Sequence, residues 1–147
     1  MMRLDRALSK LWIERPERPM SINRSGGTRI VIMTKRKVFK IPRLGSWKQF
    51  VQGMLSNITE GQWKDYGNRR LCPITYSNRF GLLVVMERAK PVMHEGLFWV
   101  ELEKLYTEVD SGKESQSRLS REFFDYDASP KNFGYINGVL VKIDYGV

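Results

Sequence analysis

The chain has 147 residues, of which 41% are hydrophobic and 12% aromatic, which fits a single globular domain and argues against disorder. Its one cysteine and one histidine exclude an internal disulfide framework and argue against a zinc site of the usual kind. The formal net charge of +9 suits nucleic acid, nucleotide phosphates or an acidic protein surface as a partner, although it could also reflect no more than a solvated basic surface.

The N-terminal part, residues 1–27, is predicted to be a short helix followed by a linker. Residues 3–14 carry apolar side chains at helical spacing, and residues 14–27 are rich in proline, glycine and charge. The first residues lack the apolar core of a signal peptide, and no apolar run approaches the roughly 18 residues that would span a bilayer. We therefore expect a cytoplasmic protein with no membrane partner.

A hairpin and a helix are predicted next. Two apolar runs, residues 30–33 and 38–41, flank a basic turn and predict two paired strands. Ser46 and Gln49 fit a capping box, which places the start of a helix at Ser46. The helix has one apolar stripe, which we expect to face the core: Trp47, Phe50, Val51, Met54, Leu55 and Ile58.

Two further strands and a helix follow. Residues 71–78 and 80–87 predict strands around a polar turn, and residues 82–86 are apolar on both faces, as in a covered strand. Residues 94–108 predict a helix, and residues 110–120 predict a polar loop.

The last predicted element is a second hairpin. Asn137 and Gly138 lie between "FGYI" and "VLVKI", a strong signal for a two-residue turn of type I′. The whole order is hairpin, helix, two strands, helix and hairpin. It predicts an α+β fold, with an antiparallel sheet first and helices after it.

The stretch around the second hairpin holds the residues most typical of a catalytic site. Asp127 and Asn132 are five residues apart, and Asp144 follows the hairpin in Asp-Tyr-Gly. A phosphoryl group in transfer carries charge that divalent cations neutralise, and amide and carboxylate oxygens are hard ligands for Mg²⁺. A separate aspartate can orient the attacking hydroxyl and accept its proton.

This order of Asp-x-x-x-x-Asn, hairpin and Asp-x-Gly resembles the protein-kinase superfamily. The resemblance implies that Asp127 is the catalytic base and that Asn132 and Asp144 bind Mg²⁺. Upstream, "KVFKIP" resembles the kinase strand Val-Ala-Ile-Lys, so Lys40 is implied to bind the phosphates of ATP. The superfamily pairs that lysine with a glutamate from the following helix, and Glu60 is the best candidate.

The stretch "GLLVVMERAKP" resembles the fifth kinase strand and the hinge. Met86 would take the gatekeeper place, and the backbones of Glu87 and Ala89 would meet the adenine edge. The implied fold is a minimal protein-kinase-like domain over residues 28–147. Residues 28–90 would form an N-lobe-like part with a helix, and residues 91–147 a reduced, truncated helical C-lobe-like part with the catalytic-loop-like hairpin.

Plainer interpretations of these residues stay open. Lys40 could be a surface lysine, and Asp127 and Asn132 could be turn residues. On a continuous helix Glu60 lies about 220° around from Trp47, away from the apolar stripe. It would then reach Lys40 only if the helix broke near Asn57, and capping of a second helical segment is the alternative role.

The sequence also departs from the kinase pattern. Residues 25–28, "SGGT", stand where a glycine-rich phosphate loop would be expected, and residues 125–127, "DYD", stand in place of His-Arg-Asp. No activation segment follows Asp-Tyr-Gly. We therefore expect a protein partner or a second copy of the chain to complete the missing lobe.

Three functions are compatible with these features. The first is a miniature phosphotransferase that uses ATP and Mg²⁺ on a hydroxyl of an unknown substrate. The second is a pseudokinase-like module that binds and regulates another protein. The third is a basic nucleic-acid-binding protein, which is possible but not favoured, because it explains the charge but not the ordered motifs. Whether the chain is an enzyme stays open.

Overall fold

The structure is a computed structural model that describes residues 20–24, 27–111 and 119–146. Five strands form an antiparallel sheet in the order β1-β2-β3-β5-β4, with the bounds Met20–Asn23, Arg29–Thr34, Lys37–Pro42, Val84–Glu87 and Ile74–Ser77. A smaller antiparallel sheet has the order β6-β7-β8, with the bounds Lys90–Pro91, Phe133–Ile136 and Val139–Lys142. The helices are α2 (Trp47–Gly61), α3 (Glu95–Ser111) and α4 (Arg121–Asp125), and a 3-10 turn, η1, spans Pro130–Asn132.

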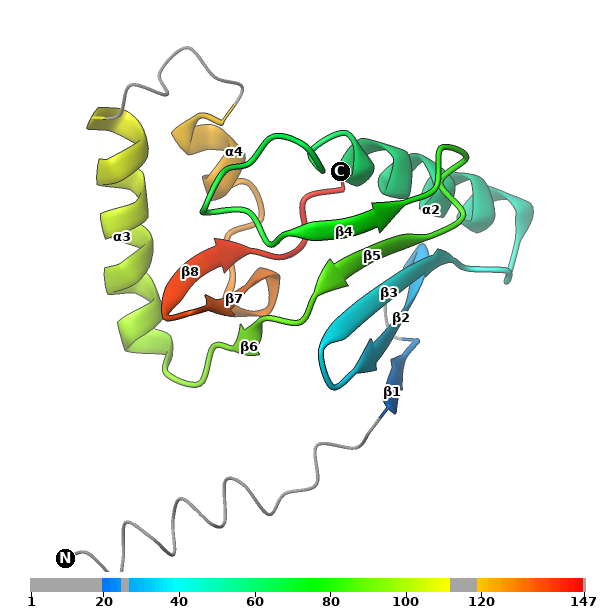
Figure 1. The fold of residues 1–147 in the computed structure, drawn as a ribbon, viewed down its shortest axis with the longest axis horizontal. Coiled ribbons are helices and arrows are strands. Elements are labelled where there is room, and N and C mark those ends of the chain that lie inside the picture. Colours follow the sequence, from blue (N-terminus) through cyan, green and yellow to red (C-terminus); the bar gives the residue numbers. More distant parts are fainter. Residues whose placement is uncertain (1–19, 25–26, 112–118, 147) are drawn as a thin grey trace, which may run out of the picture.

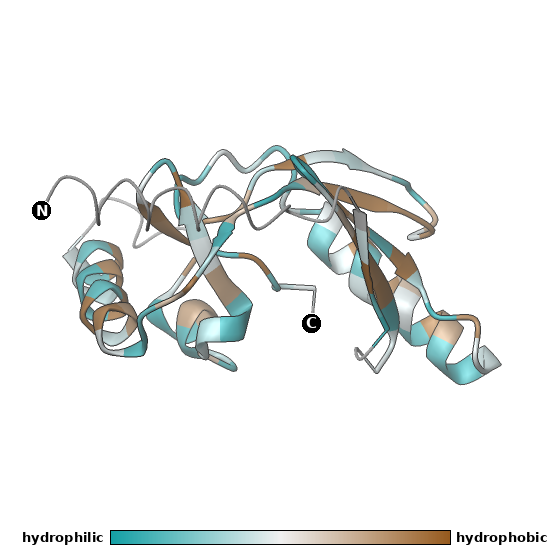
Figure 2. Ribbon diagram, turned by 90° about the horizontal axis from the view of Figure 1, so that it is seen from below, coloured by the Kyte–Doolittle hydropathy of each residue, from teal (hydrophilic) through white to brown (hydrophobic). Residues whose placement is uncertain are grey.

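The predicted α+β class is confirmed. Helix α2 packs against the five-stranded sheet, while α3, α4 and the smaller sheet form the other part of the molecule (Figures 1 and 2). The segment after β8, red in Figure 1, turns back toward α2, and Gly146 lies against the backbone of Ser56. This return brings the end of the described chain onto an element from the first half of the sequence.

The predicted hairpins are present in the expected places. Strands β2 and β3 pair with Ile32 opposite Phe39, and β4 and β5 pair as expected. The strand predicted over residues 80–87 begins only at Val84, however, because Gly81 has a φ of 74° in the turn before it, and Leu82 is 44% exposed and not covered. In the second hairpin, Asn137 and Gly138 have φ values of 49° and 77°, as a type I′ turn requires. The local turn and strand signals of the sequence were therefore sufficient for these elements.

The linker prediction for residues 14–27 needs a correction. Met20–Asn23 form β1, which pairs with β2 in antiparallel register. Backbone hydrogen bonds to a neighbouring strand do not depend on apolar alternation, so the polar composition concealed this edge strand. The predicted helix at residues 3–14 lies outside the described residues, as does most of the predicted loop at residues 110–120.

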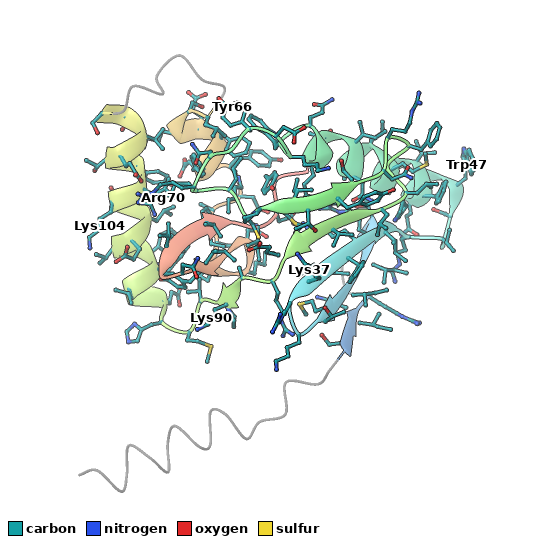
Figure 3. All side chains as sticks on the ribbon, in the orientation of Figure 1. Lys37, Trp47, Tyr66, Arg70, Lys90 and Lys104 are labelled. Atoms are coloured by element: carbon teal, nitrogen blue, oxygen red, sulfur yellow. The ribbon has the colours of Figure 1, made fainter. Side chains whose placement is uncertain are left out.

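The expected orientation of α2 is wrong. Ser46 caps the helix as predicted, since its hydroxyl accepts a hydrogen bond from the Gln49 amide at 3.2 Å. Trp47, however, is 78% exposed and projects into solvent, and Leu55 is 57% exposed (Figure 3). The fully buried positions are instead Gly53, Asn57 and Glu60.

Close packing and buried charge explain this orientation. A Cβ added at Gly53 would lie 2.4 Å from the carbonyl oxygen of Thr28, so only glycine allows α2 to approach the sheet this closely. The polar side chains on the same face find charged and polar partners on β2 and β3, which offsets the cost of burying them. The apolar stripe flanks this contact, and its central members are only half-buried.

The main hydrophobic core lies between α3, α4 and the two sheets. Its fully buried members include Met86, Phe98, Leu102, Leu105, Phe124, Phe133 and Leu140. Phe98 and Phe133 pack edge to face with ring centroids 5.4 Å apart, which joins α3 to β7. Among the described residues, no helix is both long enough and apolar enough to cross a membrane.

Candidate functional site

A cluster of four charged side chains, three of them buried, joins the sheet, α2 and the segment after β8. Lys40 Nζ donates to Glu60 Oε1 at 2.5 Å and to the carbonyl oxygen of Ile143 at 2.9 Å. Arg29 Nη1 donates to Glu60 Oε2, and Arg29 Nη2 donates to Asp144 Oδ1 at 2.8 Å. Glu60 is completely buried and therefore neutralises one cation with each of its two oxygens.

The register of the sheet places the two cations on one face. Lys40 pairs with Val31 across the β2–β3 ladder, and Arg29 pairs with Pro42 two residues along. Directly paired residues share a face, and side chains two residues apart on one strand do too. Arg29 and Lys40 therefore point to the same side, where both of them reach Glu60.

The ion pair between Lys40 and Glu60 forms without a break in α2. The helix is continuous from Trp47 to Gly61, so the proposed second helical segment capped by Asn57 is wrong. Asn57 instead fastens the helix to the sheet: its Nδ2 donates to the carbonyl oxygens of Lys40 at 3.0 Å and Gly81 at 2.9 Å. The prediction failed because the apolar stripe was taken to mark the buried face.

Arg29 is a site residue that sequence reasoning missed. Burial alone would lower the pKa of Arg29, but the carboxylates of Glu60 and Asp144 outweigh it and hold the pKa above its ordinary value. The guanidinium is thus charged at any ordinary pH. The sequence signal that could have identified Arg29 is its place as a charged residue at the start of an otherwise apolar strand, in "TRIVIM".

The predicted catalytic loop is compact. Asp127 has a φ of 48°, and η1 brings Asn132 back beside it. Asn132 Nδ2 donates to the backbone oxygen of Asp127 at 2.8 Å and to its Oδ2 at 3.0 Å. The backbone oxygen of Asn132 accepts a hydrogen bond from the Ile143 amide at 2.9 Å, which connects the loop to the residue before Asp144.

Lys142 supports this loop through hydrogen bonds to the backbone before Asp127, and it is a second residue that sequence reasoning missed. The side chain is buried, and its Nζ donates to the carbonyl oxygens of Phe123 at 2.6 Å and Tyr126 at 3.1 Å. Burial lowers the pKa of Lys142, because desolvation outweighs the nearby carboxylates. The ammonium therefore satisfies backbone groups just before Asp127 and helps to hold the loop in place.

A cleft of about 520 Å³ lies between the sheet, the β5–β6 connection and the segment after β8, within the size range of small-molecule sites. Its walls include six of the residues that the sequence singled out: Lys40, Met86, Glu87, Ala89, Asn132 and Asp144. Glu60 lies behind Lys40, and Asp127 lies beside Asn132 without being part of the cleft wall. Residues about 90 positions apart in the chain thus meet at one cavity.

The edge of the cleft at Met86 offers backbone groups to a ligand. Met86 is buried, and the amide of Glu87 is already used, since it donates to the carbonyl oxygen of Pro73 at 3.0 Å. Among the described residues, and apart from the strand ladders, the carbonyl oxygen of Glu87 accepts a weak bond from the Cys72 thiol at 3.1 Å. The Glu87 carbonyl can therefore accept a hydrogen bond from a flat heterocycle inserted at this edge.

Two side-chain oxygens in the cleft wall could serve as ligands for a metal ion. Asn132 uses its amide nitrogen toward Asp127, which leaves its carbonyl oxygen as a ligand, and Asp144 keeps one oxygen free of Arg29. Within the described residues, no three His, Cys, Asp or Glu side chains gather into a metal cage. Two oxygens suit Mg²⁺, which completes its octahedron with phosphate oxygens and water.

Comparisons with known proteins add little to this geometry. No protein-family model matches the chain, and no curated protein matches it significantly. Among solved structures, the chain is similar to a ternary complex of APH(2")-IIa with streptomycin and ATP. The sequence identity is 11% and the TM-score 0.49, over 96% of this chain and 69% of that chain. A similarity of this size carries no functional argument.

Proposed function

We propose that the chain binds ATP with Mg²⁺ in this cleft and transfers a phosphoryl group to a hydroxyl of a substrate, in the manner of a minimal protein-kinase-like enzyme. The observation that carries the proposal is the buried Lys40–Glu60 ion pair, whose lysine lines the same cleft as Asn132 and Asp144. A lysine that is held by a buried glutamate and shares a cleft with two oxygen ligands is suited to a polyphosphate and its cation. The kinase-like order of the motifs agrees with this arrangement.

Lys40 is prepared to contact a phosphate. An ammonium group has three donors, and Glu60 Oε1 and the Ile143 carbonyl take two of them. Within the part of the chain that the structure describes, the third donor is left for a phosphate oxygen in the cleft. Glu60 limits the freedom of the lysine side chain before the nucleotide binds, so less conformational entropy is lost on binding.

The nucleotide base would lie at the opposite end of the cleft. Met86 would form the wall behind the base, and the Glu87 carbonyl would accept a hydrogen bond from it. Ala89 packs against β7, where a Cβ added at Gly134 would lie 2.7 Å from the Ala89 Cβ. The close contact with Gly134 fixes the position of the backbone that would meet the adenine edge.

Asn132 and Asp144 would hold the Mg²⁺ ion, which supplies neutralisation of the charge on the transferring phosphoryl group. Asp127 would orient the acceptor hydroxyl and take up its proton. Its side chain is exposed, so a substrate can approach it, and the hydrogen bond from Asn132 sets its orientation. Lys142 keeps the backbone before Asp127 in position.

A thermal-shift titration with ATP and Mg²⁺ tests nucleotide binding. We expect millimolar ATP–Mg²⁺ to raise the melting temperature of the wild type, because a ligand that binds only the folded state stabilises it. The shift should be lost in Lys40→Ala, should lose its dependence on Mg²⁺ in Asp144→Ala, and should be kept in Lys37→Ala, a control at the start of the same strand. A wild type that is not stabilised at millimolar ATP would contradict the proposal.

A pseudokinase-like binding module is the second candidate. Asp127 is not part of the cleft wall, and one of its oxygens is taken by Asn132, which favours binding without transfer. Release or transfer of the γ-phosphate of labelled ATP distinguishes the two. Transfer by the wild type that is abolished in Asp127→Asn, with ATP binding retained, supports the enzyme. ATP binding without any release supports the module, which would act by docking on a protein partner.

A further inference from the structure

Arg29 is a buried cation that the proposed chemistry does not yet use. Its residue is 9% exposed, yet it forms part of the cleft wall beside Lys40 and Asp144. Its guanidinium bridges Glu60 on α2 and Asp144 in the segment after β8. A permanent positive charge therefore already stands where a metal-bound polyphosphate would lie.

The position of Arg29 affects any cation that Asp144 binds. Arg29 Nη2 lies 2.8 Å from Asp144 Oδ1, so this oxygen is occupied and only the other is left for a metal. The guanidinium also neutralises much of the negative charge of Asp144 and repels a divalent cation placed beside it. The site is thus weaker for metal than a free aspartate and asparagine would make it.

Arg29 also keeps donors for a ligand. A guanidinium has five N–H groups, and in the described part of the chain three of them are used: toward Glu60 and Asn57 from Nη1, and toward Asp144 from Nη2. One N–H on Nη2 and the N–H on Nε stay available. A planar fork of this kind matches the spacing of phosphate oxygens.

We propose that Arg29 is a built-in cation of the nucleotide site, which takes over part of the charge neutralisation that a divalent metal would otherwise supply. The inference rests on the proposed function, because it assigns Arg29 to the same cleft. Its consequence is specific. Binding of the ATP polyphosphate should depend only weakly on Mg²⁺. Removing the charge of Arg29 should make this binding depend strongly on Mg²⁺.

The test measures the Kd of ATP for the full chain by calorimetry, once with Mg²⁺ and once with EDTA. We expect the wild-type Kd to rise by less than about tenfold in EDTA. Arg29→Gln should lose binding in EDTA far more than binding in Mg²⁺, and Arg29→Lys, which keeps the charge, should recover part of the loss. Circular dichroism of each variant checks that it is folded.

A second variant keeps the test valid if Arg29→Gln does not fold. Asp144→Asn changes a side chain that is 46% exposed and releases Arg29 Nη2. It should abolish the effect of Mg²⁺ and tighten ATP binding in EDTA, because the freed guanidinium can turn to the phosphates. If Arg29 served only to stabilise the fold, Asp144→Asn would not tighten ATP binding in EDTA.

Three results would overturn the inference. The first is a wild type that binds ATP in Mg²⁺ but loses more than about a hundredfold in affinity in EDTA. The second is an equal loss in both conditions for a folded Arg29→Gln, which would make Arg29 purely structural. The third is weaker EDTA binding in Asp144→Asn. In all three the proposed function stands, whereas a wild type that binds ATP in neither condition contradicts the proposed function itself.

Discussion

The single cysteine illustrates how burial decides the chemistry of one residue. Cys72 is 1% exposed, with its thiol against the carbonyl oxygen of Glu87. Burial raises the pKa of the Cys72 thiol to about 12, since desolvation outweighs the favourable charge of Lys40. The thiolate, which is the reactive form, is therefore scarce in the folded chain even though the residue borders the cleft.

We predict that Cys72 resists thiol reagents at pH 8 in the folded protein and reacts rapidly in denaturant. The same shift makes stability depend on pH. Below the ordinary pKa of 9.0 the thiol is protonated in both states, whereas between 9.0 and about 12 only the unfolded chain ionises. The free energy of unfolding should therefore fall as the pH rises through this interval, and less so in Cys72→Ala.

Reaction with a chromogenic disulfide reagent, with and without urea, checks the first part. Urea titrations of the wild type and Cys72→Ala at pH 8 and pH 10 check the second. Equal reaction rates in the folded and unfolded protein would show that the thiol is accessible or ionised in the native state.

Among the helices and strands, α2 is the one for which the apolar stripe predicts the wrong buried face. Its closest approach to the sheet is at Gly53, where a Cβ would lie 2.4 Å from Thr28 O and 2.9 Å from Pro42 Cα. Both neighbours are backbone atoms and cannot move aside cheaply. The approach also brings Asn57 and Glu60 within reach of the strands, so the glycine is a condition for the buried charge cluster.

We predict that Gly53→Ala destabilises the protein by about 1–3 kcal/mol through overpacking. In an unconstrained helix the same change stabilises by about 0.4–1 kcal/mol, so the sign itself is informative. Gln52→Ala, at an exposed position of the same helix, is the matched control and should change stability by less than about 0.5 kcal/mol. Urea denaturation followed by tryptophan fluorescence measures both. A Gly53→Ala variant more stable than the wild type would contradict the close contact.

At the scale of the whole molecule, Glu60 is the residue through which separate parts of the chain meet. It binds Arg29 from β2 and Lys40 from β3, while those two cations also hold Asp144 and the backbone of Ile143. The two positive and two negative charges of the cluster balance. Removing one member is therefore costly in proportion to the buried charge that it leaves without a partner.

We predict that Glu60→Gln lowers the free energy of unfolding by about 3–5 kcal/mol, because it leaves Arg29 and Lys40 buried against a neutral amide. Lys40→Met should cost clearly less, since Glu60 keeps its ion pair with Arg29. Lys37→Met on the same strand is the control for loss of a charge that is only partly buried. Urea titrations of the three variants rank the effects, and a smaller loss in Glu60→Gln than in Lys40→Met would contradict the shared role of Glu60.

The net charge of +9 is also a property of the whole molecule, and the partner that it would attract stays a prediction. Lys35, Arg36 and Lys37 on the β2–β3 turn have no ion-pair partner among the described residues. Such a turn suits a polyanion, and a salt-dependent shift of labelled RNA or DNA would reveal one. Nucleic-acid binding, the cytoplasmic location and the domain boundary at residue 27 stay predictions.

The sequence by itself determined the elements whose signals are local. The Asn137–Gly138 turn, the Ser46 cap and the paired apolar strands appear where they were predicted, because turn geometry, capping and alternation act over a few residues. The motif order also led to Lys40, Asn132 and Asp144, which form part of one cleft.

Only the tertiary structure decided which face of α2 is buried and which charges meet there. Glu60, Arg29 and Lys142 are polar residues whose burial is favourable only when their partners arrive from distant segments. Hydrophobic periodicity identifies the apolar face of an element as the buried one, and it therefore assigns polar residues such as these three to the surface. The compensating ion pairs exist only once β2, β3, α2 and the segment after β8 have come together, and no local window of the sequence contains them.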